Sequence, residues 1–374
     1  MNLEIKKSGK NFQAWDKSQL NSVGFWALSS NEDRFYYLAS LAHLAANSHN
    51  TQPWKFSYQK EFDCLQIFIE TARVLPASDF KGRQATLSVG CAMGNLEVAA
   101  QALGCELSKK IIVSDSEVIT HSVNAILVAE YRLEKAAHFE IDEDILKMYN
   151  AIFTRRVDRG EYDHDRKIEP TLLKKIENLG TNNQVKTILI ADWGRKVALA
   201  ELQCQADSFV INNKEFANEF INEWMLENSS EQGLGMPGDT FRLNAEQTSK
   251  IKFRFKNNLG FESDDASSIA QLGKKGILSC QCVGLLTIEK DVPSEWLNAG
   301  IVLEKGALLF EANGIAWAVH AGLAEVSQIN MLMLRPIAMT SKRPVVLFRA
   351  GYLKYNEVRS PHSPRMQFET VWCN

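Results

Sequence analysis

The sequence predicts an α+β protein made of two tandem half-domains, each with a mostly antiparallel sheet flanked by helices, that pack as a pseudo-dimer within one chain. Two observations predict this class. The order of helix, strands, central helix and further strands occurs twice along the chain, and the two central helices resemble each other at a fixed spacing. We place the first half at residues 1–140 and the second at residues 141–374.

Hydrophobic periodicity supports each element of the first half. Asn31–Ala46 has apolar residues at helical spacing, and Asn31 is expected to cap that helix. Trp54–Tyr58 and Cys64–Glu70 alternate as a β-hairpin does. The remaining elements predicted in this half are a long helix over Gln84–Leu103 that ends at Gly104, and strands over Ile111–Val113 and Ala125–Tyr131, followed by a charged linker over Arg132–Asp144.

The second half repeats this pattern with an insertion. The segment from Arg195 to about Gly260 is mostly helical and long for a connection, so we predict a helical lid over about residues 195–260. The other predicted elements are helices over Asp144–Thr154, Pro170–Leu179 and, with interruptions, Trp296–His320, and strands over Lys186–Ala191, Leu278–Ile288 and Val345–Tyr352.

The two central helices share residues at a constant offset. That offset is 210 at four positions, which pair Leu87 with Leu297, Gly90 with Gly300, Ala102 with Ala312, and Gly104 with Gly314. The match predicts a duplicated unit, with chance as the alternative because Leu, Ala and Gly are common in helices.

Composition excludes several classes of protein. The net charge is −3, with 42 basic and 45 acidic side chains, so electrostatics do not support nucleic-acid binding. Met1–Lys10 is polar, unlike a signal peptide, and charged residues interrupt the apolar stretch Ala299–Ala324, which argues against a membrane span. The seven scattered cysteines are expected to be reduced thiols, so we predict a cytoplasmic protein with no membrane partner.

A polar loop between the first predicted helix and the first strand is the best candidate for a binding site. Four of its side chains, Asn47, Ser48, Asn50 and Gln52, donate or accept hydrogen bonds. Such groups suit the edge of a planar heterocycle such as a flavin. The alternative is an ordinary helix-to-strand loop, because Asn, Ser and Pro are common turn residues.

Several motifs together resemble the nitroreductase family of flavoproteins, and more narrowly its tandem, Acg-type members, in which two halves are fused. The loop from Ala46 to Trp54 is similar to the family's Pro-Ser-x-x-Asn-x-Gln-Pro-Trp motif, and Arg155–Arg159 resembles its Arg-Arg-Ser-x-Arg phosphate motif. Trp224 and Gly235-Met236-Pro237 resemble a Trp followed by Gly-Leu-Pro, and Phe348-Arg349-Ala350-Gly351-Tyr352 with Ser363-Pro364-Arg365 resembles the family's C-terminal strand and end.

The resemblance implies one FMN site per chain, because the first half holds only the polar loop and the second half only the arginine motif. FMN would be held by Asn47, Ser48, Asn50 and Gln52 of one half and by Arg155, Arg159 and Arg365 of the other. Three departures weaken the match: Asn47 replaces the family's serine, Val157 removes a phosphate donor, and Met366 replaces a terminal arginine.

The residues around the arginines leave other interpretations open. If the preceding helix continues, Arg155 and Arg159 lie at i and i+4 on one face, where an anion between them would offset their repulsion. The alternatives are that the arginines complement the dipole at the C-terminus of that helix, or that Asp158 and Glu161 neutralise them. Gly233–Gly238 matches G-x-G-x-x-G but is predicted to be a loop near the flavin, and His49 and His320 are predicted to be structural, satisfied histidines.

The activity that the resemblance implies is transfer of electrons from NAD(P)H through FMN to a small acceptor such as a nitroaromatic or a quinone. The flavin carries the redox chemistry, so no catalytic side chain and no metal is expected. The alternative is a protein that stores or sequesters FMN under an occluding lid, with little or no turnover. A third possibility is a degenerate scaffold without cofactor. The partners expected are the small-molecule acceptor and either no second chain or one further copy in a homodimer.

Overall fold

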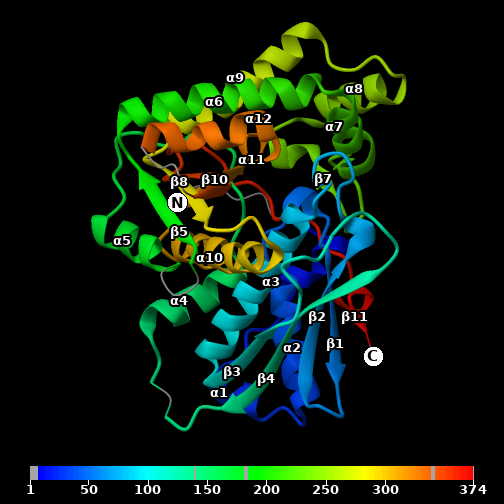
Figure 1. Ribbon diagram of the computed structural model, residues 1–374, viewed down its shortest axis with the longest axis vertical. Coiled ribbons are helices and arrows are strands. Elements are labelled where there is room, and N and C mark those ends of the chain that lie inside the picture. The colour runs from blue at the N-terminus through cyan, green and yellow to red at the C-terminus, as the bar shows by residue number, and fades with distance from the viewer. Residues whose placement is uncertain (1–6, 139, 181–183, 338–341, 374) are drawn as a thin grey trace.

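The computed structural model describes residues 7–138, 140–180, 184–337 and 342–373. Residues 1–6 of the polar N-terminal stretch therefore lie outside the described residues. Two separate, mostly antiparallel sheets lie on either side of a pair of crossing helices, α3 (Arg83–Ala102) and α10 (Pro293–Ala312) (Figure 1). The first sheet is formed by strands of the first half together with one short strand from the C-terminal tail. The predicted α+β class and the two-sheet arrangement are confirmed.

The first sheet has the strand order β11-β1-β2-β4-β3. Its strands are β1 (Trp54–Gln59), β2 (Cys64–Glu70), β3 (Cys105–Ile111), β4 (Ala125–Lys135) and β11 (Trp372–Cys373), and its helices are α1 (Ser22–Trp26) and α2 (Asn31–Ala42). The predicted hairpin is confirmed, with Trp54 opposite Ile69. The predicted linker is wrong over its first residues, because β4 continues to Lys135 in register with β3.

The second sheet has the order β5-β8-β10-β9, with antiparallel neighbours throughout. Its strands are β5 (Lys186–Ile190), β8 (Cys282–Ile288), β9 (Ala316–His320) and β10 (Arg343–Gly351). The shorter helices of this half are α5 (Pro170–Asn178), α11 (Gly322–Glu325), α12 (Ser327–Asn330) and α4 (Glu143–Ile152), the last of which packs against α10 and α3. The helix predicted to reach His320 instead ends at Ala312. Gly314, with φ of +66°, turns the chain into strand β9.

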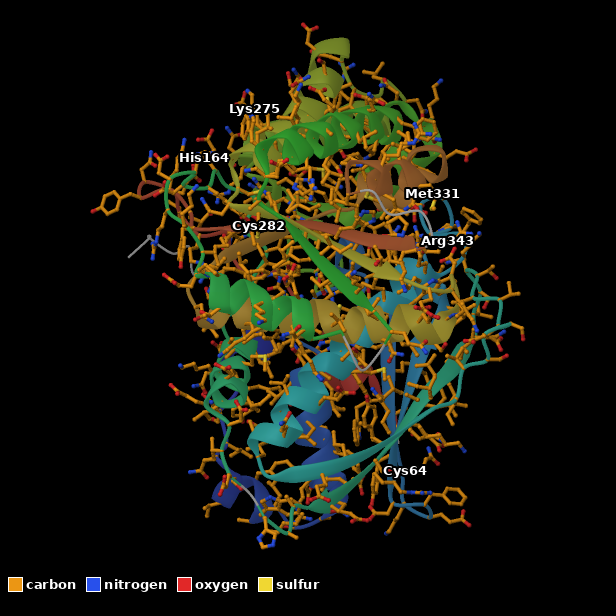
Figure 2. The ribbon with its side chains drawn as sticks, turned by 60° about the vertical axis from the view of Figure 1, so that its left-hand side comes forward. Cys64, His164, Lys275, Cys282, Met331 and Arg343 are labelled. Carbon is orange, nitrogen blue, oxygen red and sulfur yellow. The ribbon has the colours of Figure 1, made fainter. Side chains whose placement is uncertain are left out.

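The predicted helical lid begins close to the expected residue and extends further along the chain. It comprises α6 (Trp193–Asn212), α7 (Lys214–Asn218), a π-helical turn at Glu219–Trp224, α8 (Ala245–Lys256) and α9 (Ser263–Ser279), with the short strands β6 (Met225–Leu226) and β7 (Met236–Pro237) between them. Helices α6 and α9 pack side by side at the end of the molecule opposite the first sheet (Figure 1). Figure 2 likewise shows Lys275, on α9, far from Cys64 at the start of β2.

The two central helices cross where the sequence offset predicts a correspondence. A Cβ atom placed on Gly90 would lie 2.2 Å from the carbonyl oxygen of Leu297, and one placed on Gly300 would lie 2.0 Å from that of Leu87. These contacts are reciprocal, as they would be around a local two-fold axis between α3 and α10. Only glycine allows the two backbones this approach. The common origin of the two halves stays a prediction.

The C-terminal tail returns from the second half to the first. After β10 the chain runs back along the polar loop, and its last short strand, β11, pairs in parallel with β1, with Phe56 opposite Trp372. The core is continuous across both halves, because α10 and α3 contribute buried residues to one cluster with β1, β2 and β8. Among the described residues, no helix is both long and apolar enough to cross a membrane.

Candidate functional site

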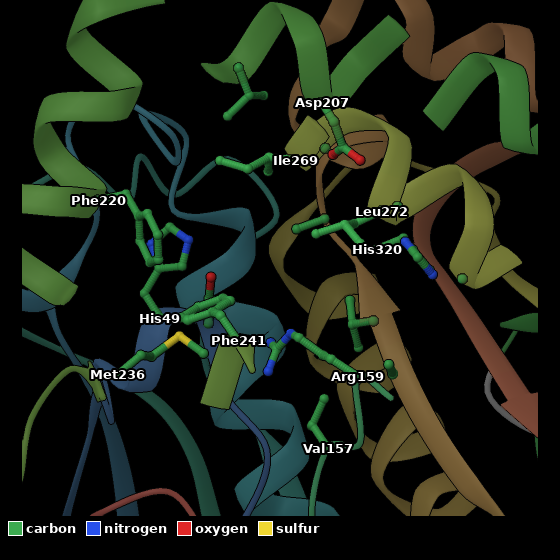
Figure 3. A pocket seen from close by; sticks show the side chains of 18 of the residues that line it. His49, Val157, Arg159, Asp207, Phe220, Met236, Phe241, Ile269, Leu272 and His320 are labelled. Atoms are coloured by element: carbon green, nitrogen blue, oxygen red, sulfur yellow. The ribbon is translucent and has the colours of Figure 1, made fainter. Parts of the chain in front are cut away.

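A cavity of about 1190 Å³ lies where the two halves meet beneath the helical lid. Its lining brings together segments that are far apart in the sequence (Figure 3). The polar loop contributes Asn47, Ser48, His49 and Asn50, helix α3 contributes Gln84 and Ser88, the arginine segment contributes Arg155, Val157 and Arg159, strands β9 and β10 contribute His320 and Arg349, and the lid contributes Gln203, Asp207, Ile269 and Leu272.

The polar loop has an unusual backbone. His49, Asn50 and Gln52 have φ angles of 47°, 55° and 48°, in the left-handed region that is uncommon for residues other than glycine. Such strain persists only where surrounding contacts impose it, and it concentrates at functional sites. Asn47 contributes one of these contacts, because its side-chain oxygen accepts a hydrogen bond from the backbone amide of Gln52 at 2.9 Å.

The side chains of Asn50 and Gln52 are used to hold this loop in place. The Asn50 amide donates to the carbonyl oxygens of Gly235 and Pro364, both at 2.9 Å. The side-chain Nε2 of Gln52 donates to the Gly233 carbonyl at 2.7 Å, and its Oε1 accepts from the backbone amide of Met366 at 3.1 Å. Gln52 is buried and does not line the cavity. Both side chains therefore connect the loop to the lid segment and to the C-terminal tail.

Arg365 uses its donors on the protein itself. Its guanidinium donates to the carbonyl oxygens of His43, Leu44 and Ala45, each at 2.9 Å, at the end of helix α2. It also donates to Asn50 Oδ1 at 2.8 Å and to the Pro364 carbonyl at 3.0 Å. Five hydrogen bonds match the five N–H groups of a guanidinium. Burial lowers the pKa of Arg365 to about 9, with a smaller contribution from Arg155.

Arg155 is buried against a carboxylate. Its Nε lies 2.9 Å from Glu304 Oε1, and its Nη2 donates to the Leu44 carbonyl at 2.6 Å. Glu304 belongs to α10, and its other oxygen accepts from the Ala46 amide at 3.1 Å. Burial raises the pKa of Glu304, and the charge of Arg155 opposes that shift. Arg155 and Glu304 therefore link the polar loop to a central helix.

Arg159 differs from these two arginines. Helix α4 ends at Ile152, so the predicted i, i+4 relation of Arg155 and Arg159 is wrong. Beyond the helix, the Asp158 amide donates to the Trp317 carbonyl of β9 at 2.9 Å. Arg159 points into the cavity over the ring of Phe241, at 4.8 Å (Figure 3).

The acids that were expected to neutralise Arg159 are engaged elsewhere. Asp158 pairs with Arg359 at 3.1 Å, and Glu161 pairs with Lys354. Within the described part of the chain, Arg159 forms no ion pair and donates only to the Thr240 carbonyl, at 3.2 Å. Burial, then the nearby Arg349, lowers its pKa to about 10.

Two cavity residues that the sequence did not identify as binding residues, Arg349 and His320, lie near Arg159, and we call these three residues the positive wall. Arg349 of β10 is 4% exposed, and its Nε and Nη1 have no hydrogen-bond partner among the described residues. His320 of β9 is 9% exposed, and its Nε2 is likewise unpartnered there. Burial lowers the pKa of His320 well below its usual value, and Arg349 and Arg159 lower it further. Buried donors beside uncompensated positive charge are a recognition site for an anion.

The histidines correct one sequence-based prediction. His49 and His320 were expected to be satisfied structural residues, but each has one ring nitrogen, Nδ1 and Nε2 respectively, without a partner among the described residues, and each lines the cavity. Burial and then Arg159 lower the pKa of His49 to about 4, so its ring is neutral at pH 7. The Gly233–Gly238 segment does not open a helix of nucleotide-binding type. It forms a loop and the short strand β7 beside Asn50.

Comparisons with known proteins give short or distant matches. No protein-family model matches the chain. Two curated relatives from Mycobacterium tuberculosis, the uncharacterized proteins MT3212 and Rv3127, are each 36% identical over 64 residues, or 17% of this chain. The matched segment spans only 19% of the length of each relative.

Among solved structures, the chain is similar to nitroreductases, the family that its motifs resemble. The FMN-dependent nitroreductase NfnB from Mycobacterium smegmatis, solved in complex with NADPH, is 16% identical. That match covers 60% of this chain and 96% of NfnB, with a TM-score of 0.38. A nitroreductase with bound FMN from Bacteroides fragilis is 12% identical and covers 56% of this chain and 90% of its own, with a TM-score of 0.34.

Proposed function

We propose that this protein is an FMN-binding oxidoreductase of the nitroreductase type, with one FMN in each chain. The observation that carries the proposal is the cavity itself, which joins the polar loop of the first half to Arg159 of the second. Its volume of about 1190 Å³ lies somewhat above the usual range of small-molecule and cofactor pockets, which leaves room for a flavin and a second small molecule.

The positive wall fits the phosphate of FMN. A phosphate monoester carries close to two negative charges and accepts several hydrogen bonds, and arginine donates in a matching planar fork. Arg159 brings a positive charge without a carboxylate partner among the described residues, and Arg349 brings buried N–H donors that no described group satisfies. The unpartnered Nε2 of His320 adds a donor when the neutral ring carries its proton on that nitrogen. We assign the phosphate to this wall, where these donors offset the loss of a phosphate ligand at Val157.

The ring and ribityl chain would lie along the polar loop and α3. Asn47 and Ser48 line the cavity, and the Ser48 hydroxyl donates to the Gln84 carboxamide of α3, which fixes the loop against that helix. The Ser48 amide donates to Ser88 Oγ at 3.1 Å. We assign to Asn50, Gln52, Arg155 and Arg365 the task of holding this loop in shape, because their polar atoms are used by protein groups.

FMN, when bound, supplies the redox chemistry. The chain supplies orientation through the loop, charge through the positive wall, and shielding from water through α6 and α9 above the cavity. The reductant would be NAD(P)H, and the acceptor a nitroaromatic, a quinone or a similar small molecule.

The first experiment is the visible absorption spectrum of the purified protein, followed by release and identification of the cofactor. One equivalent of FMN is the expected result. FAD would refute the cofactor assignment, and no flavin after reconstitution with FMN would refute the function.

The phosphate assignment is tested by comparing FMN with riboflavin, which lacks the phosphate. Arg159→Gln and Arg349→Gln should each weaken FMN roughly 10- to 100-fold, the effect of losing a hydrogen bond to a charged group. Riboflavin affinity should not change. Arg343→Gln is the matched control, because Arg343 lies on the same strand as Arg349 but is exposed. Equal weakening of both flavins would contradict the assignment.

The second candidate function is storage of FMN. It is favoured by one observation, that α6 and α9 contribute Gln203, Asp207, Ile269 and Leu272 to the cavity and so cover it. Steady NAD(P)H oxidation in the presence of a quinone or nitro compound would exclude storage as the sole function. Bound flavin that is reduced by light but not by NAD(P)H would exclude the enzyme.

A further inference from the structure

The end of the cavity beneath the lid differs chemically from the positive wall. It is formed by Gln203 and Asp207 of α6 and by Glu325 of α11, all of which line the cavity. Figure 3 shows Asp207 at one end of the pocket and Arg159 and Val157 toward the other, with Ile269 and Leu272 of α9 between them. We call Gln203, Asp207 and Glu325 the acceptor end, because their side chains present hydrogen-bond acceptors to the cavity.

The polar atoms of the acceptor end are short of donors. The Gln203 amide donates to Asp207 Oδ1 at 2.6 Å, which leaves Gln203 Oε1 facing no donor among the described residues, although the side chain is only 1% exposed. Glu325 Oε1 is also buried without a hydrogen-bond partner in that part of the chain. Buried acceptors of this kind are normally satisfied, and here they line a cavity.

Two glycines keep side chains away from the Asp207 carboxylate. A Cβ atom on Gly273 of α9 would lie 2.2 Å from Asp207 Oδ2, and one on Gly322 of α11 would lie 2.6 Å from Oδ1. No larger residue fits at either position without displacing the carboxylate. The carboxylate is thus held between two helix backbones, with Ile269 and Leu272 as the apolar walls of the adjoining space.

The local charges do not balance. Asp79, in the loop before α3, forms a group of three carboxylates with Asp207 and Glu325. It accepts hydrogen bonds from the backbone amides of Gln84 and Ala85 at the start of α3, both at 2.9 Å. That helix terminus partly offsets its charge. Arg83 favours the ionised form of Glu325, so when all three carboxyl groups are ionised they carry more negative charge than Arg83 balances.

An organic cation fits the acceptor end better than a metal ion does. The residues that the structure describes contain no group of three or more His, Cys, Asp or Glu side chains arranged to hold one. An amidinium or ammonium group supplies both the positive charge and the several N–H donors that these acceptors lack.

We propose that the acceptor end binds the cationic head, an amidinium or primary ammonium, of a small second ligand whose flat apolar body lies against Ile269 and Leu272. This site is separate from the positive wall and does not depend on which cofactor that wall holds. In an oxidoreductase, this second ligand would be the electron acceptor. The electron acceptors expected for this protein are therefore small molecules that carry a basic nitrogen group.

Binding of a cation at this end should release protons. Burial raises the pKa of Asp207 to about 7 and that of Glu325 to about 8, with Asp79 and Asp207 adding to the shift of Glu325. A bound cation favours the ionised carboxylates, so affinity should rise as the pH increases from 6 to 9. The other charged or titratable groups on surrounding elements are Asp79, Arg83, His320 and Lys274, the last paired with Glu201.

The test uses benzamidine as the cationic probe and benzamide as its neutral analogue. Isothermal titration calorimetry of the purified protein at pH 8.5 and low salt should give benzamidine roughly tenfold or more the affinity of benzamide, the effect of one charge-assisted hydrogen bond. Asp207→Asn and Glu325→Gln should each reduce benzamidine affinity roughly tenfold. Glu223→Gln is the control, because Glu223 is an exposed acid of the same helical lid.

Four results would overturn the proposal. The first is equal affinity for benzamidine and benzamide, and the second is benzamidine affinity unchanged in both Asp207→Asn and Glu325→Gln. The third is benzamidine affinity that does not rise with pH, and the fourth is release of bound flavin as benzamidine is added. The two variants are prepared and measured separately, so misfolding of one leaves the other as the test. Flavin absorbance is recorded in the same titration. Failure of this site is therefore distinguishable from absence of flavin.

Discussion

Replacing Arg365 by glutamine separates two roles for the same residue. The sequence motif suggests that Arg365 contacts the FMN phosphate, whereas the structure shows its guanidinium bonded to carbonyl oxygens at the end of α2 and to Asn50. If the contacts in the structure determine its role, Arg365→Gln should destabilise the fold and leave the preference for FMN over riboflavin unchanged.

The size of the loss follows from which acceptors lose their donor. Leu44 keeps a donor in Arg155, and the carbonyl of Ala45 keeps one in the side chain of Asn47. The His43 carbonyl and Asn50 Oδ1 lose the donor that Arg365 provides. Two buried acceptors left unsatisfied cost about 1–3 kcal/mol each, so we expect the free energy of unfolding to fall by about 2–6 kcal/mol.

The assay is urea denaturation of flavin-free protein, because bound flavin would add its own stabilisation. Arg343→Gln serves as control, since its side chain is exposed. An Arg365→Gln variant whose free energy of unfolding matches the wild type, but which no longer prefers FMN to riboflavin, would refute the structural role and restore the phosphate contact.

Three further predictions concern stability. Gly300→Ala should lower the free energy of unfolding by about 1–3 kcal/mol through overpacking against α3. Gly306→Ala is the control in the same helix, because a Cβ there meets nothing closer than 3.8 Å, and it should be neutral or stabilising. Both variants are measured by urea denaturation, and equal losses of unfolding free energy in the two would contradict the crossing geometry. Glu304→Gln leaves the buried Arg155 without its carboxylate and should cost about 3–5 kcal/mol, measured the same way; a loss below 1 kcal/mol would show that this ion pair is not needed. His43, which accepts from Trp54 Nε1 at 2.9 Å, has its pKa lowered to about 3 by burial, so the unfolded state takes up a proton below pH 6.5 while the folded state does not. Stability should therefore fall as the pH drops from 6.5 toward 3, with His43 contributing about 2 kcal/mol of the loss at pH 5, and His43→Gln should remove that part of the pH dependence.

Local sequence patterns predicted most of the elements. Period-two alternation located the β1–β2 hairpin, and the offset of 210 pointed to Gly90 and Gly300, which lie at the helix crossing. The strand β9 was missed because a short apolar run such as Ala316–His320 fits a buried strand or a helix equally well. The turn at Gly314 decides between the two.

Side-chain partners were the part that the sequence could not supply. Arg155, Arg159 and Arg365 looked equivalent in the motif, yet the first meets Glu304, the second enters the cavity, and the third meets backbone carbonyls. These differences depend on α10 and α2, which are distant in sequence. Arg349 carried a weak signal, as an arginine in an otherwise apolar strand, and such a residue calls for a partner or a ligand.

The contacts of the polar loop set the order in which the site can form. His49, Asn50 and Gln52 adopt a backbone that is unfavourable by itself. Two partners of the Asn50 side chain, Pro364 and Arg365, lie more than 310 residues later in the chain. During synthesis strands β1 to β4 and helices α1 to α3 can form long before that arginine leaves the ribosome. The loop would become rigid only when the tail docks, so competence to bind a cofactor would be the last property that the folding chain acquires.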